Sequence, residues 1–337
     1  MPVELPKAEY LEQQVFRTHN EDTFYQIALS VFQFQYHNNP VYRQFCTLLN
    51  KGPEVVNEIT DIPFLPISFF KTKEIKNTEF EPELIFQSST TTGSVPSRHF
   101  IKKESLYRQS FLHNFELFYG AVQQYTILGL LPSYLERGNS SLVYMVQELI
   151  HLSKHPMSDF YLYDFNKLYN TLTALEKQRQ KTLLIGVTYA LLEFAQSFSL
   201  PLQHTIVMET GGMKGRREEW TRSEVHAALQ QAFSLNAVHS EYGMTELLSQ
   251  AYAFKEGIFS APEQMRILLR EEDDPYALYL KVQKPASGAI NIIDLANLYS
   301  CSFLATDDRG RLHPDGTFEV LGRLDNSDIR GCSLLYL

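Results

Sequence analysis

The part of the sequence that most constrains the fold is residues 125–233, where short apolar runs alternate with segments of helical character. The apolar runs are too short for helices and are bounded by turn-forming residues, so they are predicted as buried strands. Such alternation predicts an α/β architecture. The expected strands are 125–131, 182–186 and 205–209. The expected helices are 189–197 and one that begins at Thr221, where Thr221 and Glu224 form a capping-box pair, whereas 141–151 has mixed character.

The flanking regions differ from this central part. Before it, helical spacing from Phe24 to Phe32 and over 103–118 predicts two helices, 84–86 is a short strand, and the proline-punctuated segment 62–70 is expected to be extended. The last third is predicted to be rich in β-structure, with a hairpin turn at Pro314-Asp315-Gly316. Its expected strands are 266–269, 277–282, 289–295, 303–305 and 317–321.

Composition excludes several classes of protein. The chain has 337 residues and a net charge of -9, which argues against a nucleic-acid-binding surface. Cys46, Cys301 and Cys332 are widely spaced and form no CxxC pair, so we expect a reduced, cytoplasmic protein without a zinc framework. Residues 1–14 lack the pattern of a signal peptide. The most apolar run, 182–195, contains Glu193 and is shorter than the roughly 18 residues of a membrane span.

The segment 240–246, Ser-Glu-Tyr-Gly-Met-Thr-Glu, carries the strongest chemical signal. Gly243 lets the backbone turn and a ligand approach, the Thr245 hydroxyl can donate to a phosphate oxygen, and Glu246 can bind a hard cation. A structural alternative is that Gly243 ends a strand and Thr245 caps a helix. Residue 248 is leucine, however, so the capping box would be incomplete.

A second signal is the loop 87–98, in which seven of twelve residues are Ser or Thr. Hydroxyls and free backbone amides crowded after a strand suit a triphosphate, with Arg98 as a candidate cation. A flexible surface linker would have a similar composition. The spacing is not that of a Walker A loop.

Two further segments are compatible with a nucleotide. Gly211 and Gly212 follow an expected strand and can let a flat ring approach the backbone, although a plain glycine-rich turn fits as well. Asp307 follows another strand and can accept hydrogen bonds from both ribose hydroxyls, but aspartate is also a common turn residue. Gly322 and Arg323 come shortly after it.

These four segments, in this order, resemble the core motifs of the adenylate-forming superfamily of acyl and aryl ligases. Within it the chain is similar to the acyl-protein synthetase family, which includes the synthetase component of the fatty-acid reductase of bacterial bioluminescence. The similarity rests on 210–214 (Thr-Gly-Gly-Met-Lys), 241–246 and 330–334 (Arg-Gly-Cys-Ser-Leu).

The resemblance implies an α/β adenylate-forming large domain with a β-rich C-terminal portion. It also implies roles for particular residues, with ATP and Mg2+ as cofactors. Ser88, Ser89, Thr90, Thr91, Thr92 and Gly93 would hold the ATP phosphates, Gly211 and Gly212 would border the adenine, and Tyr242 and Gly243 would belong to the same nucleotide site. Thr245 would contact the α-phosphate, Glu246 would hold Mg2+, Asp307 and Arg323 would bind the ribose and its surroundings, and Cys332 would accept the acyl group.

The chain departs from the superfamily pattern in the phosphate loop. Thr90 stands where a glycine is usual, an extra residue lies near Val95, and no lysine follows Pro96. The sequence also stops shortly after the hinge-like Asp325, so we expect a catalytic domain over 1–323, a hinge-like remnant and tail over 324–337, and no full C-terminal lid domain.

The expected activity is the ATP-dependent conversion of a carboxylic acid, expected to be a fatty acid, to an acyl adenylate, followed by transfer to a thiol. Cys332 is the expected thiol, and Arg330 would lower its pKa; alternatively Cys332 is a small apolar residue in a terminal strand. An acyl reductase would then take the acyl group. Two other functions stay open: direct transfer from the adenylate to coenzyme A or an acyl carrier protein, and non-catalytic nucleotide binding.

Overall fold

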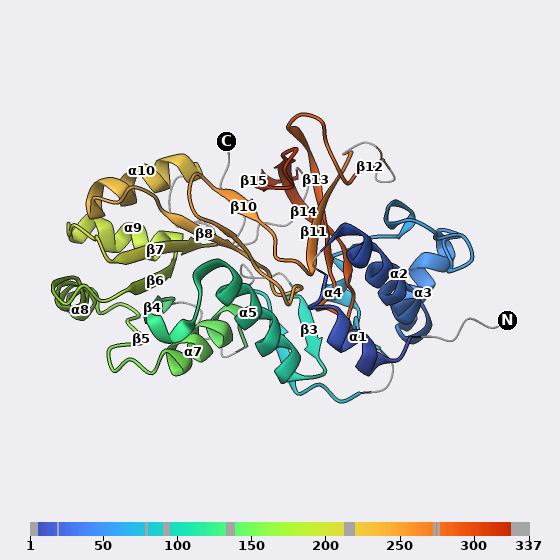
Figure 1. Cartoon of the computed structure of the whole chain (residues 1–337), viewed down its shortest axis with the longest axis horizontal. Helices are drawn as coiled ribbons and strands as arrows, with labels where there is room; N and C mark the ends of the chain where they lie inside the picture. Colours follow the sequence, from blue (N-terminus) through green and yellow to red (C-terminus); the bar gives the residue numbers. More distant parts are fainter. Residues whose placement is uncertain are drawn as a thin grey trace.

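The computed structural model describes residues 6–18, 20–77, 80–89, 95–132, 139–211, 220–271, 274 and 277–324. Within these ranges a 13-stranded sheet runs through the molecule, with helices packed on it (Figure 1). The sheet has a parallel half and an antiparallel half, and β8 (His239–Tyr242) joins them. A separate two-stranded hairpin, β2 (Leu84–Gln87) with β3 (Arg98–Ile101), lies beside it.

The parallel half confirms the predicted α/β architecture. Its strands lie in the order β5-β4-β6-β7-β8 and all run in the same direction. Helices connect successive strands and cover both faces, with α9 and α10 on one side and α5 and α7 on the other (Figure 1). The remaining strands of this half are β4 (Thr126–Leu130), β5 (Asp159–Phe160), β6 (Thr182–Val187) and β7 (Thr205–Thr210). The helices are α5 (Glu104–Tyr119), α7 (Ser141–Ser153), α8 (Phe165–Lys177), α9 (Thr188–Ser197) and α10 (Arg222–Phe233), with a 3-10 turn η2 (Val122–Gln124).

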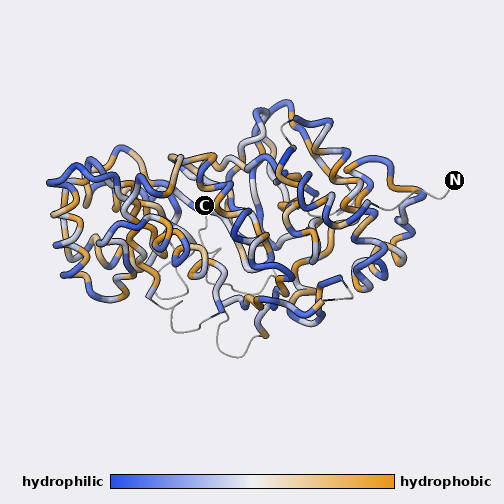
Figure 2. The backbone as a smooth tube through the Cα atoms, turned by 60° about the horizontal axis from the view of Figure 1, so that its bottom comes forward, coloured by the Kyte–Doolittle hydropathy of each residue, from blue (hydrophilic) through white to orange (hydrophobic). Residues whose placement is uncertain are grey.

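Two of these helices show why the local sequence folds as it does. Thr221 caps α10, and the Thr221 and Glu224 side chains form the predicted capping box. The segment of mixed character, 141–151, is a regular helix, because the Ser140 side chain accepts a hydrogen bond from the Val143 amide and so caps it. Along the helices, hydrophobic and hydrophilic residues alternate (Figure 2), as expected of elements with one buried face.

The antiparallel half confirms the β-rich last third, but two predicted strands differ in length, and the short strands β9 and β10 were not predicted. The predicted strand 303–305 extends much further, because it forms a long hairpin with β15, and the predicted strand 277–282 is reduced to two residues. The strands are β9 (Ala251–Ala253), β10 (Ile258–Ser260), β11 (Met265–Arg270), β12 (Leu278–Tyr279), β13 (Ala286–Asp294), β14 (Phe303–Leu312) and β15 (Phe318–Arg323).

The N-terminal helices pack against the antiparallel half (Figure 1). The Gln35 amide donates to the Asn297 and Leu298 carbonyls, and the Phe32 ring contacts Phe303. The segment 62–70 is not wholly extended as expected: β1 pairs with β14, but a helical turn begins at Phe69. The elements here are α1 (Ala8–Gln14), α2 (Glu21–Asn38), α3 (Pro40–Leu48), η1 (Ile59–Asp61), β1 (Leu65–Pro66) and α4 (Phe69–Thr72).

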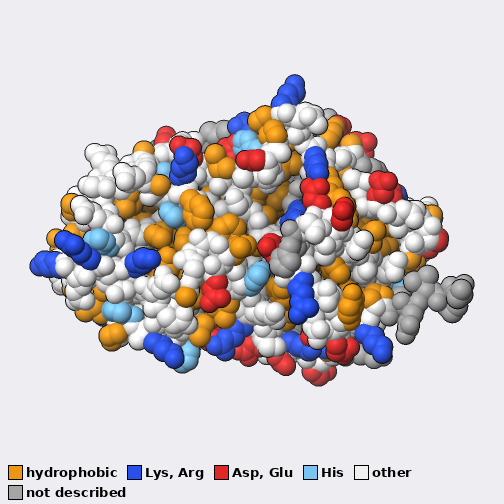
Figure 3. Space-filling model, in the orientation of Figure 1, with side chains coloured by type: hydrophobic (Ala, Val, Ile, Leu, Met, Phe, Trp, Pro, Cys, Tyr) orange, Lys and Arg blue, Asp and Glu red, His pale blue; other side chains and the backbone are white. Residues whose placement is uncertain are grey.

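The surface charges and the helix lengths relate to the predictions about nucleic-acid binding and membrane spans. On the face in Figure 3, Lys and Arg side chains are scattered among acidic and apolar ones. Every helix in the described ranges is too short or too polar to cross a membrane. Residues 325–337 lie outside the described residues, so the division of the chain at 323/324 stays a prediction.

Candidate active site

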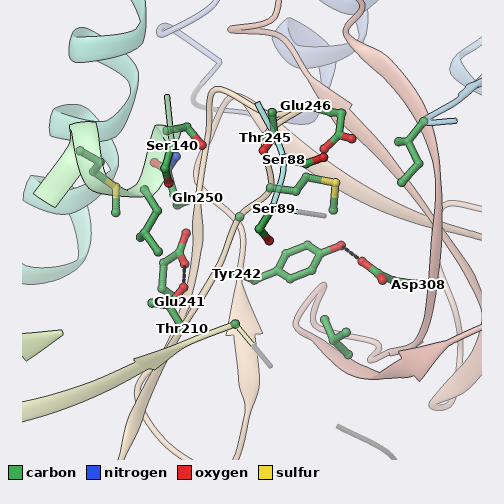
Figure 4. Close-up of a pocket in the computed structure, with 18 of the residues that line it drawn as sticks. Ser88, Ser89, Ser140, Thr210, Glu241, Tyr242, Thr245, Glu246, Gln250 and Asp308 are labelled. Carbon is green, nitrogen blue, oxygen red and sulfur yellow. Dashed lines mark hydrogen bonds between the residues drawn. The ribbon is translucent and has the colours of Figure 1, made fainter. Parts of the chain in front are cut away.

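A cleft lies where the carboxyl ends of β7 and β8 meet the segment after β2 and the hairpin of β14 and β15 (Figure 4). The empty space in and in front of it, including space open to solvent, is about 1170 Å³. The carboxyl edge of a parallel sheet is where α/β proteins commonly bind ligands, because strand ends and the loops after them meet there. Most of the predicted site residues that the structure describes line this cleft: Ser88, Ser89, Gly211, Tyr242, Gly243, Thr245, Glu246 and Arg323.

The β8 segment turns after Tyr242 without forming a helix. Residues 243–250 have no helical assignment, and the Leu247 amide closes a turn on the Met244 carbonyl at 3.0 Å. The structural alternative, in which Thr245 caps a helix, is therefore wrong. Thr245 and Glu246 instead stand in a turn at the wall of the cleft.

Two buried side chains hold this turn from outside the cleft. His99 on β3 lies 2.7 Å from the Thr245 carbonyl through Nδ1, and burial lowers the pKa of His99 to about 4. Because a carbonyl only accepts hydrogen bonds, Nδ1 carries the proton of the neutral ring. On the other side, the Asn297 amide donates to the Glu246 carbonyl at 2.7 Å. The backbone of Thr245 and Glu246 is thus fixed by partners distant in sequence.

The segment that follows is anchored by Asp294 at the end of β13. Its Oδ2 accepts from the amides of Leu248 and Ser249 at 2.8 and 2.9 Å, and its Oδ1 accepts from the Ser249 hydroxyl at 2.7 Å. Burial raises the pKa of Asp294, while these donors favour its ionised form. This anchor fixes the path of the chain between the motif and β9.

The Ser/Thr loop is described only at its two ends. The Ser88 amide donates to the Ser97 carbonyl at 3.1 Å, and the Ser97 amide donates to the Ser88 hydroxyl at 2.9 Å. These two hydrogen bonds close the base of the loop, and Ser88 and Ser89 line the cleft there. The predicted phosphate residues Thr90, Thr91, Thr92 and Gly93 lie outside the described residues.

The glycine pair is described in part. Gly211 follows β7 with a φ of 75°, a conformation that favours glycine, and it lines the cleft. Thr188 donates a hydrogen bond to its carbonyl. Gly212 lies outside the described residues.

Two successive aspartates of β14 have different surroundings. Asp308 lines the cleft and accepts a 2.8 Å hydrogen bond from the Tyr242 hydroxyl (Figure 4). Asp307, the predicted ribose residue, is not among the lining residues, and its Oδ2 pairs with the Arg323 guanidinium at 2.7 Å. The geometry therefore favours Asp308 over Asp307 as a ligand-contacting residue.

Sequence reasoning assigned no role to Glu241, although it lies within the motif. Its side chain is buried, lines the cleft and accepts a hydrogen bond from Thr210, its register partner on β7. Burial, together with the nearby Glu209 charge, raises the pKa of Glu241 to about 7, although the Thr210 hydrogen bond lowers it. In the sequence, the only indication of a role for Glu241 was its position directly before Tyr242 on a strand whose side chains alternate between two faces.

Glu209 on β7 has the opposite electrostatic character. It is buried, but Arg222 Nε lies 3.3 Å and His226 Nε2 lies 3.6 Å from its Oε1. Burial alone would raise its pKa, and the His226 hydrogen bond with the Arg222 charge outweighs that effect and lowers it. Near neutral pH the Glu209 carboxyl group is thus ionised, whereas that of Glu241 is partly protonated.

The described part of the chain offers a limited set of metal ligands. Among the described residues, no group of three or more His, Cys, Asp and Glu side chains is placed to hold a metal ion. Glu246 is one buried carboxylate at the cleft wall. This donor set fits Mg2+ that arrives with a nucleotide, because Mg2+ often takes one or two carboxylates and completes its shell with phosphates and water. The predicted acyl acceptor, Cys332, lies outside the described residues.

A solved structure supports the fold. The chain superposes on o-succinylbenzoate CoA synthetase from Bacillus subtilis with a TM-score of 0.51 and 16% identity, over 73% of this chain and 50% of that one. A long-chain-fatty-acid-CoA ligase from Archaeoglobus fulgidus gives a TM-score of 0.48 and 15% identity, over 74% and 53%. The chain thus spans about half the length of these structures. The predicted α/β fold of the large domain of adenylate-forming enzymes is confirmed.

Sequence comparisons extend over nearly the whole chain. A curated relative, the long-chain-fatty-acid–luciferin-component ligase of Vibrio harveyi, is 26% identical over 336 residues, which cover 91% of this chain and 85% of the relative. The profile of the acyl-protein synthetase family LuxE matches residues 13–336. The chain therefore belongs to the LuxE acyl-protein synthetase family.

Proposed function

We propose that this chain is an ATP-dependent acyl-protein synthetase, which activates a fatty acid as an acyl adenylate and then passes the acyl group to a thiol. Family membership and the ligase name of the Vibrio harveyi relative support acid activation. The observation that carries the proposal is the convergence of Ser88, Ser89, Thr245, Glu246 and the Tyr242–Asp308 pair on one cleft.

The nucleoside of ATP would lie on the Tyr242 side of the cleft. The Tyr242 ring is buried beside Phe318 and is held by Asp308, so it offers a fixed aromatic face. Asp308 would accept hydrogen bonds from the ribose hydroxyls. Arg323 would flank the ribose, with Asp307 orienting its guanidinium. Gly211 and Gly212 would allow the adenine to approach the backbone.

The phosphates would lie against the hydroxyls of Ser88, Ser89 and Thr245, extended by Thr90, Thr91, Thr92 and Gly93. Glu246 would hold Mg2+ together with phosphate oxygens. Bound there, the ion would neutralise phosphate charge. The turn that carries Thr245 and Glu246 is fixed by His99 and Asn297, so these groups need little reorganisation when the substrate binds.

The first reaction is the formation of the mixed anhydride. A carboxylate oxygen of the acid bonds to the α-phosphorus of ATP, and the bond from that phosphorus to the bridging oxygen of pyrophosphate breaks. The products are acyl-AMP and pyrophosphate. The chain binds and orients both anions, and Thr245 donates to the α-phosphate as charge is redistributed.

The second reaction is transfer to a thiol, for which we propose Cys332 in a tail over 324–337. Its thiolate would attack the acyl carbonyl, the bond to the phosphate oxygen would break, and AMP would leave. A partner with acyl-reductase activity would then accept the acyl group from the thioester.

The test is the mass of the intact protein after incubation with ATP, Mg2+ and a panel of fatty and aryl acids. We expect an acyl adduct on the wild type that neutral hydroxylamine releases, and no adduct on Cys332→Ser, which should still catalyse ATP–pyrophosphate exchange. Cys46→Ala is the matched control, because Cys46 is buried and burial raises the pKa of its thiol to about 12. This variant should still carry the adduct.

Other outcomes assign other functions. An AMP product formed only when coenzyme A or carrier protein is added, without an adduct, would indicate direct transfer from the adenylate. Nucleotide binding without exchange for any acid would indicate a non-catalytic protein.

A further inference from the structure

The cleft has a second side, away from Tyr242 and Asp308, that the nucleotide leaves free in the proposed function. We call it the α7 side; its lining side chains are Tyr107, Ser140, Leu142, Met145, Glu241 and Gln250. In the view of Figure 4, Glu241 and Gln250 lie on one side of Ser89, and the Tyr242–Asp308 pair lies on the other. Leu142 and Met145 offer apolar surface next to these two polar groups.

The position of the Glu241 carboxyl group follows from the geometry of β8. Successive side chains of a strand point to opposite faces, so Glu241 points away from the face that carries Tyr242. Thr210 donates to its Oε2. A Cβ atom added to Gly243 would lie 2.4 Å from Oε1, which means that this oxygen lies directly over the glycine backbone. The carboxyl group is therefore close in sequence and space to the turn that begins the phosphate site.

The described groups around Glu241 favour its neutral form. Tyr107 and Tyr119 on α5 and Tyr252 on β9 face it, and burial raises the pKa of each of them, so they are neutral. On its own strand, burial lowers the pKa of His239 to about 4, so this ring is neutral as well.

Among the described residues, Glu209 supplies the remaining charge that acts on Glu241, and that charge is negative. Below about pH 7 the Glu241 carboxyl group therefore carries a proton and can donate a hydrogen bond.

Gln250 provides a second polar group on the same side. Its side chain is buried, and its Oε1 has no hydrogen-bond partner in the described part of the chain. Its Nε2 makes only a long hydrogen bond of 3.4 Å to the Leu248 carbonyl. Turning this amide would present an N–H donor to the cleft at the cost of that weak contact.

We propose that Glu241 and Gln250 bind the carboxyl group of the acid substrate, with Glu241 acting as a hydrogen-bond donor in its neutral form. This inference rests on the proposed function. The alkyl chain of the acid would lie against Leu142 and Met145. Two carboxyl groups that share one proton attract each other, whereas two ionised ones repel, so ionisation of Glu241 weakens acid binding.

The test measures acid affinity against pH in two ways. Equilibrium dialysis with radiolabelled decanoate, without ATP, gives Kd from pH 6 to pH 9, and ATP–pyrophosphate exchange gives KM for decanoate and for ATP over the same range. In the wild type we expect Kd and KM for decanoate to rise about tenfold per pH unit above the Glu241 pKa. KM for ATP should not follow this profile.

Two variants should change the pH dependence of decanoate affinity in different ways. Glu241→Gln keeps the size and a donor but cannot ionise, so its affinity for decanoate should not depend on pH. Thr210→Val removes the hydrogen bond that lowers the Glu241 pKa, so the loss of affinity should begin at higher pH than in the wild type. Thermal unfolding checks that both variants fold.

The outcomes separate this inference from the proposed function. Exchange with a KM for decanoate that is independent of pH, or a pH profile that Glu241→Gln retains, would overturn the inference and leave the function standing. Binding that depends on pH through Glu241 without any exchange would overturn the function and leave the inference standing. Failure of the wild type to bind decanoate or any other acid of the panel would overturn both.

Discussion

The Tyr242 hydroxyl donates a hydrogen bond of 2.8 Å to Asp308 Oδ2 and so joins the end of β8 to β14 across the cleft. Both side chains are buried. The bond links the parallel half of the sheet to the antiparallel half at the point where the ligand is expected. Asp307, one residue earlier, pairs with Arg323 instead.

This arrangement predicts different effects for two neighbouring substitutions. Asp308→Asn should raise KM for ATP by about 10- to 100-fold, because a neutral amide replaces a carboxylate that accepts from Tyr242 and, in the proposed site, from the ribose. Asp307→Asn should have a smaller effect, since it acts through Arg323. Steady-state ATP–pyrophosphate exchange measures both. A larger effect at Asp307 would restore the assignment made from the sequence.

The position of Gly243 next to Glu241 predicts an effect on acid binding. In Gly243→Ala the new methyl group would lie 2.4 Å from Glu241 Oε1, so the buried carboxyl group has to move away from Thr210. We expect KM for the acid to rise about tenfold and the free energy of unfolding to fall by about 1 to 3 kcal/mol. Exchange kinetics and denaturant unfolding measure these changes.

Gly52→Ala is the matched control for this clash. Its methyl group would lie 2.3 Å from a carboxylate oxygen of Glu54, but Glu54 is exposed and can turn into solvent. The expected change in unfolding free energy is within about 0.5 kcal/mol. Equal effects of the two substitutions would show that the Glu241 carboxyl group moves freely.

Much of the fold could be predicted because the central parallel strands β4 and β6 are buried along their whole length. All six residues of β6 are buried, so an uninterrupted apolar run marks the strand, and the helices between strands carry their own periodicity. The helix α7 was harder to predict because its start depends on the Ser140 cap rather than on apolar spacing. The length of β14 depends on pairing with β15, which local sequence does not encode.

The site could be predicted only in part, for reasons of register and burial. Choosing between Asp307 and Asp308 requires the pairing of β14 with β15, which contains an irregularity at Arg309/Gly310. The chemistry of Glu241 arises because Tyr107, Tyr119 and Tyr252, distant in sequence, exclude water from it. No motif of adjacent residues carries that information.

The ion pair of Arg222 and Glu209 predicts a large effect on stability. Arg222→Met removes a charge 3.3 Å from a carboxylate that is almost inaccessible to solvent, and it also removes the hydrogen bond from Nη1 to the Val320 carbonyl. Loss of one partner of a buried pair typically costs about 3 to 5 kcal/mol, which denaturant unfolding would show.

Lys167→Met is the matched control for Arg222→Met, because it removes a charge from an ion pair at the surface. Lys167 and Asp159 lie 3.1 Å apart with more than half of each side chain exposed, at 53% and 56%. The expected loss is less than about 1 kcal/mol, because solvent screens an exposed pair. A similar cost for both substitutions would contradict the strong coupling of Arg222 to Glu209.

Glu241 also predicts how stability changes with pH. Its pKa is raised from 4.5 to about 7 in the folded protein, so the native state binds more protons than the unfolded state between these values. Stability from this group is therefore fully present below about pH 4.5 and is lost as the pH rises through about 7. Glu241→Gln removes this loss. The difference in unfolding free energy between the variant and the wild type should therefore shift in favour of the variant by up to about 3 kcal/mol from pH 4.5 to pH 8. Urea unfolding of both proteins at the two pH values measures the difference, and parallel profiles for the two proteins would show that the Glu241 carboxyl group is not desolvated in solution.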